Sequence, residues 1–409
     1  MVVGDELLTG RVIDTNSALL GRMLDDIGLR LTRVTRVADS EPAIREAIRT
    51  EQAELLFVIG GLGPTPDDCT LAALAAEFRL QLKVDRQLLA GIQERFRRRG
   101  RRMPVLARRQ ALVPAGAQLL ANPLGMVPGM VIARQKQLVI LLPGVPQEFE
   151  ALVRESVIPL LRERFGCNTL PRLLLRTFGI PESAIAERVK CLLAGHRRVR
   201  VGYYPSVTGV DIVLRARSAA ALKSLQNRLR RTLGDAVYTT SEQTIQEAIA
   251  EQLLEQRASV AVAESCTGGL VGDMLTSVPG SSEWFVGGVI CYSNLLKMLL
   301  CGVREATLAR YGAVSRETVF QMARGVRALA GADFGLAVSG IAGPGGGSES
   351  KPVGLVYVGV ADSNRVVVER HLFNGNRRMV KEQSAMAGLI LLLRQIRRRI
   401  RLPRQRATV

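Results

Sequence analysis

Apolar residues alternate between helical and strand-like spacing over the first 165 positions. A helix that stops at Gly28 is predicted by apolar residues at helical spacing, namely Leu19, Leu20, Met23 and Leu24. Positions 29–37 alternate between apolar and polar residues, which predicts a strand. The uninterrupted apolar run at 55–59 predicts a strand that is covered on both faces, and it ends in GGLGPTPDD. This alternation favours βαβ units around a parallel sheet.

The pattern changes near residue 170 and again after Ser241. Between these points the order is strand, helix, hairpin and a basic helix at 219–233, which predicts a small α+β unit. Thr244 and Glu247 then have the spacing of a capping box, ahead of further alternating strands and helices. We therefore predict an α/β protein with two three-layer α/β/α domains, joined by a small α+β domain. The predicted boundaries are 1–166, 167–240 and 241–409.

Composition excludes several classes of protein. The 409 residues are 47% hydrophobic and 23% charged, which is typical of a globular chain with two or three domains. The longest apolar stretch, at 385–393, is about half of a membrane span of roughly 20 residues, and no leader pattern opens the chain. We therefore expect a cytoplasmic protein whose six scattered cysteines are free thiols. With only two histidines, a histidine-rich metal centre or a Ser-His-Asp triad is not expected.

The chain carries 56 Lys and Arg against 37 Asp and Glu, a formal net charge of +19. Much of the excess lies in two arginine-rich runs, at 95–109 and 394–406, that contain no acidic residue. Aromatic residues make up only 4% of the chain, so stacking platforms for single-stranded nucleic acid are scarce. We interpret the runs as solvated surface charge, with nucleic-acid contacts that are only non-specific; a nucleic-acid-associated protein remains the alternative.

A first candidate site follows the strand at 55–59. Glycines at the end of a parallel strand let a phosphorylated ligand approach the backbone, and Asp67 and Asp68 suit a hard cation that bridges a pyrophosphate. Alternatively, Asp68 caps the next helix and the glycines only form the turn. Together with loops after other predicted strands, the candidates for this nucleotide site are Glu6, Asp14, Asn16, Gly60, Gly61, Gly63, Thr65, Asn122 and Gly125.

A second candidate site follows the strand SVAVA. The string AESCTGG places Ser265, Cys266 and Thr267 between a strand and a helix, where a nucleophile is well presented. Either Ser265 or Cys266 can be the nucleophile, and the alternative is that Ser265 or Thr267 caps the helix. Lys297 lies one turn into a helix predicted from Asn294. A partly buried lysine can act as the base that histidine does not supply, although an exposed helix lysine is the simpler interpretation.

Two further features follow later strands. The glycine-rich turn SGIAGPGGG at 339–347 suits a phosphate or an oxyanion, because its amides can face a negative charge. Arg377 precedes the last helix and offers a guanidinium fork for phosphate or carboxylate.

The motifs of this chain occur in an order that resembles one protein family. AESCTGG, VPGSS, YSNxxK, GAVS, GIAGPGGG and KPVGLVY resemble the C-terminal amidase domain of the CinA family, the nicotinamide-nucleotide amidohydrolases. GDELLTG, GGLGPTPDD, NPLGMVPG and LPGVPQEFE resemble the N-terminal domain of that family, which is similar to molybdopterin-binding proteins. The middle unit resembles the family's small KH-like connector. The resemblance covers essentially the whole chain.

The resemblance implies a C-terminal amidase that converts nicotinamide mononucleotide to nicotinic acid mononucleotide and ammonia without a cofactor. It implies Ser265 as the nucleophile, Lys297 as its base partner and Tyr292 as an assisting hydroxyl. The residues expected to bind substrate are Thr267, Gly268, Gly269, Asn294, Ser339, Gly340, Gly343, Gly345 and Arg377. It also implies a homodimer that acts on small nucleotides.

For the N-terminal domain the resemblance implies an ADP-ribose pyrophosphatase. Its divalent metal, of unknown identity, would be held by Asp67 and Asp68. The alternative for the whole chain is a nucleotide- or molybdopterin-binding regulatory protein with vestigial catalytic sites. Two features depart from the family pattern. Only three residues precede Gly4, which predicts a trimmed N-terminal sheet. Gly-Asn-Arg stands in place of Gly-Asp-Arg, so a carboxylate that could orient Arg377 is missing.

Overall fold

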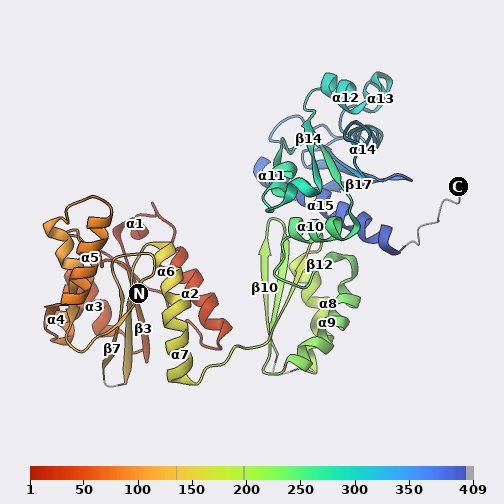
Figure 1. Ribbon diagram of the computed structural model, residues 1–409. Helices are drawn as coiled ribbons and strands as arrows, with labels where there is room; N and C mark the ends of the chain where they lie inside the picture. The colour runs from red at the N-terminus through yellow and green to blue at the C-terminus, as the bar shows by residue number, and fades with distance from the viewer. Residues whose placement is uncertain (135, 197–198, 402–409) are drawn as a thin grey trace. The chain divides into compact units, whose positions relative to one another are not determined.

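The computed structural model describes residues 1–134, 136–196 and 199–401 (Figure 1). The chain divides into two compact units, Met1–Leu170 and Pro171–Val409. The end of the second arginine-rich run, from residue 402 onward, lies outside the described residues. Within them, no helix is both long and apolar enough to span a membrane, and all six cysteines are free.

The first unit is built on a sheet of six strands in the order β2-β1-β3-β8-β7-β6. Its members are β1 (Val2–Val3), β2 (Arg36–Val37), β3 (Leu55–Ile59), β6 (Gln118–Leu120), β7 (Gly129–Arg134) and β8 (Gln137–Leu142). Strands β2, β1, β3 and β8 are parallel, and β7 and β6 are antiparallel additions. A separate pair is formed by β4 (Leu82–Val84) and β5 (Leu112–Pro114).

Helices cover both faces of this sheet, because its strands are apolar on both sides. One face packs on α2 (Thr15–Asp26), α6 (Pro146–Leu152) and α7 (Ile158–Phe165), and the other on α3 (Glu41–Thr50) and α4 (Thr70–Phe78) (Figure 1). The short α1 (Asp5–Leu8) follows β1, and the basic α5 (Arg86–Arg98) follows β4. The predicted three-layer α/β/α arrangement is confirmed for this unit.

The second strand is shorter than predicted. The alternation at 29–37 predicts nine strand residues, but only Arg36–Val37 form β2. The reason is its neighbour: β1 contains two residues, so the parallel ladder has only the pairs Val2–Arg36 and Val3–Val37. Alternating side chains alone do not make a strand when the backbone finds no partner.

The second unit begins with a KH-like part. Its elements are β9 (Arg172–Thr177), α8 (Glu182–Ala194), β10 (Arg200–Ser206), β11 (Gly209–Arg215), α9 (Ala219–Leu233) and β12 (Val237–Thr239). The strands form an antiparallel sheet in the order β10-β11-β9-β12. Leu225 and Leu229 of α9 share a buried cluster with Leu175 of β9 and Ile185 of α8, so both helices cover one face of the sheet. The predicted small α+β unit is confirmed.

The last part is again an α/β/α sandwich. Its strands are β13 (Val260–Glu264), β14 (Phe285–Ile290), β15 (Phe334–Gly340), β16 (Leu355–Ala361) and β17 (Val366–Leu372), in the order β14-β13-β15-β16-β17. Strands β14, β13 and β15 are parallel, while β16 and β17 continue the sheet as antiparallel strands. The carboxyl ends of the central parallel strands therefore share one edge.

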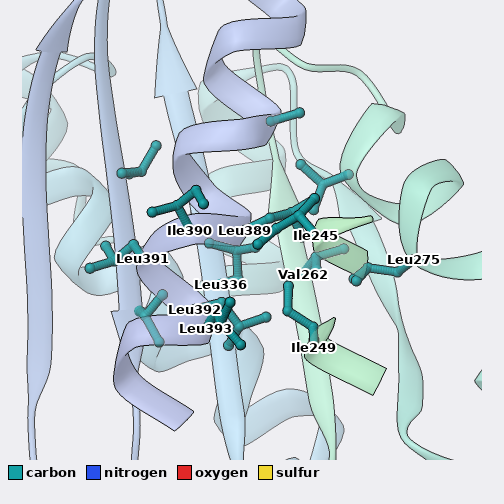
Figure 2. Packing of buried hydrophobic residues seen from close by; sticks show 14 of the residues in the cluster. Ile245, Ile249, Val262, Leu275, Leu336, Leu389, Ile390, Leu391, Leu392 and Leu393 are labelled. Atoms are coloured by element: carbon teal, nitrogen blue, oxygen red, sulfur yellow. The ribbon is translucent and has the colours of Figure 1, made fainter. Parts of the chain in front are cut away.

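Two helical layers enclose this sheet. One contains α10 (Ile245–Gln256), α11 (Leu270–Thr276) and α15 (Arg377–Arg401), and the other contains α12 (Asn294–Cys301), α13 (Glu305–Tyr311) and α14 (Arg316–Ala330). Figure 2 shows leucines of α15 packed among Leu336 of β15, Val262 of β13 and Ile249 of α10. The apolar stretch at 385–393 is therefore the core-facing part of α15. The capping box of Thr244 and Glu247 at the start of α10 is confirmed.

A helical glycine sets the distance between α12 and α14. A Cβ on Gly325 of α14 would lie 1.8 Å from the carbonyl oxygen of Cys301, the last residue of α12. We expect Gly325→Ala to lower Tm, because overpacking a buried contact costs about 1–3 kcal/mol. Gly91→Ala in α5 is the control: a Cβ there meets nothing within 4 Å, and helix propensity favours alanine by about 1 kcal/mol. A Gly325→Ala protein as stable as the wild type would contradict this interpretation of the packing.

Candidate active site

The second candidate site lies where two parallel strands end. Strands β13 and β14 are neighbours, and Glu264 pairs with Ile290 at their carboxyl ends. Ser265 directly follows β13, and Tyr292 follows β14 just before α12. Because the strands are parallel, both loops emerge at the same edge of the sheet. The register thus brings together two segments that are about thirty residues apart in the sequence.

Lys297 contacts Ser265 at this edge. Its Nζ donates to Ser265 Oγ at 3.1 Å and to the carbonyl oxygens of Cys291 and Tyr292 at 2.9 Å and 3.0 Å. Helix α12 begins at Asn294, as predicted, so Lys297 lies in its first turn and points back to the strand ends. An ammonium has three N–H donors, and these three acceptors satisfy all of them.

Burial changes the ionisation of Lys297. The residue is only 1% exposed, so the interpretation as an exposed helix lysine is wrong. Burial lowers the pKa of its ammonium, because the charged form loses hydration. No carboxylate within the described residues forms an ion pair with it. The free thiols of Cys291 and Cys301, 3.8 Å apart, lie within the same apolar cluster on this side of the sheet.

Cys266 lies beside Ser265 but in a different environment. Burial raises the pKa of its thiol to about 12, so the thiol stays protonated at neutral pH. Lys297 Nζ bonds to Ser265 Oγ and forms no hydrogen bond with the Cys266 thiol. The capping alternative is also excluded, because Gly269 is the N-cap of α11 and the first amides of that helix donate to Glu264, not to Ser265 or Thr267.

Glu264 is a buried carboxylate that the sequence analysis did not select. Its Oε2 accepts from the amides of Gly269 and Val271 at 2.9 Å and 3.1 Å, and its Oε1 accepts from Gly272 at 2.8 Å. Its carbonyl accepts from the Cys291 amide at 2.9 Å. Glu264 therefore fixes the loop around Ser265 on one side and the Lys297 acceptors on the other. The only signal in the sequence was an acidic residue at the end of an apolar strand.

Tyr292 and Arg377 meet at the same edge. Arg377 NH2 donates to the Tyr292 hydroxyl at 3.2 Å, and NH1 donates to the carbonyl of Gly343 at 2.7 Å. The glycine-rich turn and the start of α15 therefore join the Ser265 region. The Gly343 carbonyl and the Tyr292 hydroxyl orient Arg377. These two neutral oxygens take the role that we had expected of the carboxylate missing from Gly-Asn-Arg.

The remaining predicted substrate-binding residues are either exposed or packed inside the domain. Gly268, Gly345 and Asn294 are exposed, and the Asn294 side chain forms no hydrogen bond with any described residue. Thr267 is fully buried and its hydroxyl has no partner in that part of the chain. The Ser339 hydroxyl donates to the carbonyl of Ala313 at 2.8 Å, which gives it a structural role. Gly340, the last residue of β15, packs so closely on Val356 that a Cβ would clash.

The first candidate site is a pocket of about 630 Å³ in the first unit. It lies at the carboxyl ends of β1, β3 and β8, as the rule for open α/β sheets predicts. Eight of the predicted residues line it, namely Glu6, Gly60, Gly61, Gly63, Thr65, Asp67, Asp68 and Gly125. Burial raises the pKa of Asp39, a further carboxylate of this pocket, and nearby Glu6 and Asp68 add to the effect.

The other three predicted residues support the pocket from outside. Asp14 caps α2 by accepting from the Ser17 amide, and Asn16 donates to the carbonyl of Gly144 at 2.8 Å. Asn122 Oδ1 accepts from the Gly125 amide, and its Nδ2 donates to Glu148 Oε2 at 2.8 Å. These side chains hold loops in place.

Asp68 stabilises a turn. Its Oδ2 accepts from the Thr65 amide at 2.8 Å and from the Thr65 hydroxyl at 2.5 Å. Helix α4 starts at Thr70 with Cys69 as its N-cap and has no side-chain cap, so the prediction that Asp68 caps it is wrong. The Asp67 side chain is exposed and forms no hydrogen bond within the described residues.

Arginines that we had assigned to surface charge contact this pocket. Arg109 donates to the carbonyls of Thr65 and Asp68 at 3.1 Å and 3.3 Å, and Arg95 donates to the carbonyl of Gly125. Arg95 and the exposed Arg99 also line the pocket. Part of the first arginine-rich run therefore stabilises the loops of a site that carries several carboxylates.

Fold and sites together define a three-part α/β protein, with one polar site at a sheet edge in each of its two sandwiches. Residues 1–163 match the "Probable molybdopterin binding domain", 173–239 the "Damage-inducible protein CinA KH domain" and 242–396 the "CinA C-terminal domain". The chain belongs to the CinA family.

Full-length relatives have the same extent. A CinA-like protein of Thermosynechococcus vestitus is 40% identical over 96% of this chain and 97% of its own, and one of Thermotoga maritima is 35% identical over 98% of both. A crystal structure of the competence damage-inducible protein A of Klebsiella pneumoniae is 32% identical; the match covers 37% of this chain and 95% of that one, with a TM-score of 0.37.

Proposed function

We propose that the C-terminal domain hydrolyses the carboxamide of nicotinamide mononucleotide to nicotinic acid mononucleotide and ammonia, without a cofactor. The observation that carries the proposal is the contact of 3.1 Å between Lys297 Nζ and Ser265 Oγ. A serine hydroxyl is a weak nucleophile at neutral pH and needs a neighbouring base. A buried lysine with a lowered pKa supplies one.

The two carbonyl acceptors determine where the lone pair of a neutral Lys297 amine points. When Lys297 is neutral, its two N–H groups bond to Cys291 and Tyr292, and its lone pair faces the remaining partner, Ser265 Oγ. Lys297 then takes the serine proton while Oγ attacks the carboxamide carbon. The same proton is passed to the leaving ammonia. Water hydrolyses the acyl-serine in a second step, with Lys297 again as the base, and free acid is released.

The loop after Ser265 supplies donors for the oxyanion. Among the described residues, the backbone amides of Cys266 and Thr267 donate to no backbone carbonyl. Amides fixed in a loop need little reorganisation when negative charge develops, and removing one such donor lowers kcat by about 10²–10³-fold. Glu264 keeps this loop rigid, because its carboxylate accepts hydrogen bonds from three backbone amides.

The runner-up is a nucleotide- or molybdopterin-binding regulatory protein with vestigial sites. A purely structural lysine needs only acceptors for its N–H groups, which backbone carbonyls can supply, whereas burial next to a serine hydroxyl lowers the lysine pKa and gives that hydroxyl a base. The nearly complete burial of Lys297 against Ser265 therefore favours the enzyme.

We expect Ser265→Ala to lower the rate of ammonia release from nicotinamide mononucleotide by about 10³-fold or more, because the nucleophile is lost. Cys266→Ala is the matched control, one residue further along the same loop, and should keep activity within a few-fold. The measurement is enzyme-coupled ammonia detection on the purified chain. An active Ser265→Ala protein would sink the mechanism, and an inactive wild type the function. A large loss in Cys266→Ala alone would identify the thiol as the nucleophile.

The activity should rise with pH. Neutral Lys297 is the reactive form, so kcat/KM increases as pH rises through the pKa of this residue and is lost as pH falls below it. Because burial lowers that pKa, the midpoint should lie below the ordinary lysine value. The measurement is kcat/KM over about pH 6 to pH 10. A profile that is flat over this range, or that falls, would contradict a lysine base.

For the N-terminal domain we propose hydrolysis of ADP-ribose at its pyrophosphate with a divalent metal. The described residues contain no group of three or more His, Cys, Asp or Glu placed to hold a metal by themselves. A hard cation such as Mg²⁺ is often held by one or two carboxylates together with substrate phosphates. Asp67, and Asp68 through its second oxygen, fit that requirement. The metal would neutralise charge on the diphosphate, and the glycines at 60–63 would allow its close approach. We also propose that the chain forms a homodimer.

We expect Asp67→Asn to lower metal-dependent hydrolysis of ADP-ribose by at least about 10-fold, because one hard oxygen ligand becomes a neutral amide. Asp235→Asn, an exposed carboxylate of the KH-like part, is the control. The assay is release of AMP with and without a chelator. Activity that survives both the chelator and Asp67→Asn would rule out this site.

A further inference from the structure

The KH-like part carries much of the positive charge of the chain. Residues 171–240 contain 13 Lys and Arg against 4 Asp and Glu, an excess of nine out of the formal +19 of the whole chain. Helix α9 contains no acidic residue and four basic ones, Lys223, Arg228, Arg230 and Arg231. This short segment therefore holds nearly half of the excess charge.

All four basic side chains of α9 face solvent. The apolar stripe of the helix, which includes Leu225 and Leu229, is buried in the core of the KH-like part, whereas the four cations are exposed. None of them forms an ion pair or a side-chain hydrogen bond with another described residue. At about 100° per residue, Arg228 lies roughly 140° around the helix from Lys223. The cations therefore border the exposed face of α9 on both sides.

The energetics of the helix itself accounts for only two of these cations. Arg230 and Arg231 lie in the last turn, where a positive charge interacts favourably with the helix dipole. Lys223 lies near the start of the helix and Arg228 in its interior, where the dipole does not stabilise them. Like charges three residues apart, such as Arg228 and Arg231, also repel each other. The face is therefore suited to an external partner that is negatively charged.

The composition of the two helices limits the kind of anion. Among the described residues, α8 and α9 expose no large apolar side chain that could insert into a lipid surface. Neither helix contains an aromatic residue on which single-stranded bases could stack. Residues 171–240 also contain no GXXG string, the loop with which KH domains clamp single strands. The remaining chemistry, a row of guanidinium and ammonium groups, is that which binds the phosphates of a duplex.

We propose that α9 docks into the major groove of double-stranded DNA and binds the phosphates on both sides of it, without reading the sequence. A helix with its side chains is about 10–12 Å across, which fits the major groove of B-form DNA, about 12 Å wide. The major groove of A-form RNA is too narrow for it. Lys223 and Arg228, on opposite borders of the exposed face, then contact opposite strands. This inference does not depend on the proposed hydrolase activities.

The test measures how DNA binding depends on salt, by fluorescence anisotropy with the full chain and a labelled duplex of about 20 base pairs of arbitrary sequence. Four phosphate contacts predict that the affinity of the wild type falls about 100-fold between about 50 and 200 mM salt. In the double variant Lys223→Gln, Arg228→Gln we expect the slope of log Kd against log salt to be smaller by about two. Glutamine is a good helix former, so Tm should not change.

The double variant Arg97→Gln, Arg98→Gln is the matched control. It removes two exposed charges from α5, another basic helix, where both already pair with Glu94, and should leave the slope unchanged. An equal loss in both double variants would show an effect of net charge alone and overturn the proposal. An unchanged slope in the α9 variant, or a wild type that does not bind at about 50 mM salt, would do the same. So would binding to single-stranded DNA, duplex RNA or polyglutamate that is as tight as binding to duplex DNA.

Discussion

The candidate active site depends on one hydrogen bond between a buried amine and a serine hydroxyl. Lys297 can remain buried only because Cys291, Tyr292 and Ser265 satisfy its three donors. Two of these acceptors are backbone carbonyls at the end of β14, and their position is set by the ladder between β13 and β14. Chemistry and fold are therefore coupled: any shift of β14 against β13 would remove the acceptors and leave an unsatisfied ammonium in the core.

Close approach between elements maintains this arrangement. Gly325 lets α12 pack directly on α14, and Gly288 lets β14 lie against Val262 of β13, where a Cβ would come within 2.4 Å of a methyl group. Glu264 adds a polar connection, since its carboxylate binds the start of α11 and its carbonyl binds Cys291. The rigidity that a preorganised oxyanion site requires thus comes from small residues and one buried carboxylate.

Much of the fold could be predicted from the sequence, because its signals are local. The capping box at Thr244 and the hairpin of β10 and β11 need only a few neighbouring residues, and both are present. The predicted length of the strand at 29–37 was wrong, because strand length depends on a distant partner, the two-residue β1. At the site, Lys297 and Ser265 could be selected as candidates, but their contact depends on the sheet register. Glu264 was missed, since an acidic residue in a string does not reveal whether its partners are backbone amides, another side chain or solvent.

The positive charge of the chain has a more specific meaning than its total suggests. From composition alone, the excess of 56 basic over 37 acidic residues indicates only that the surface carries solvated positive charge. In the structure the individual cations differ: Arg378 is neutralised within its own helix, Arg109 and Arg95 bond to loop carbonyls, and Lys381 has no partner among the described residues. These cations act differently on their surroundings, because paired charges largely cancel within a few ångströms and exposed ones are screened within about 8 Å at physiological salt. Partner accounting, cation by cation, therefore separates the cations that hold loops and helices from those without a partner among the described residues, a distinction that net charge hides.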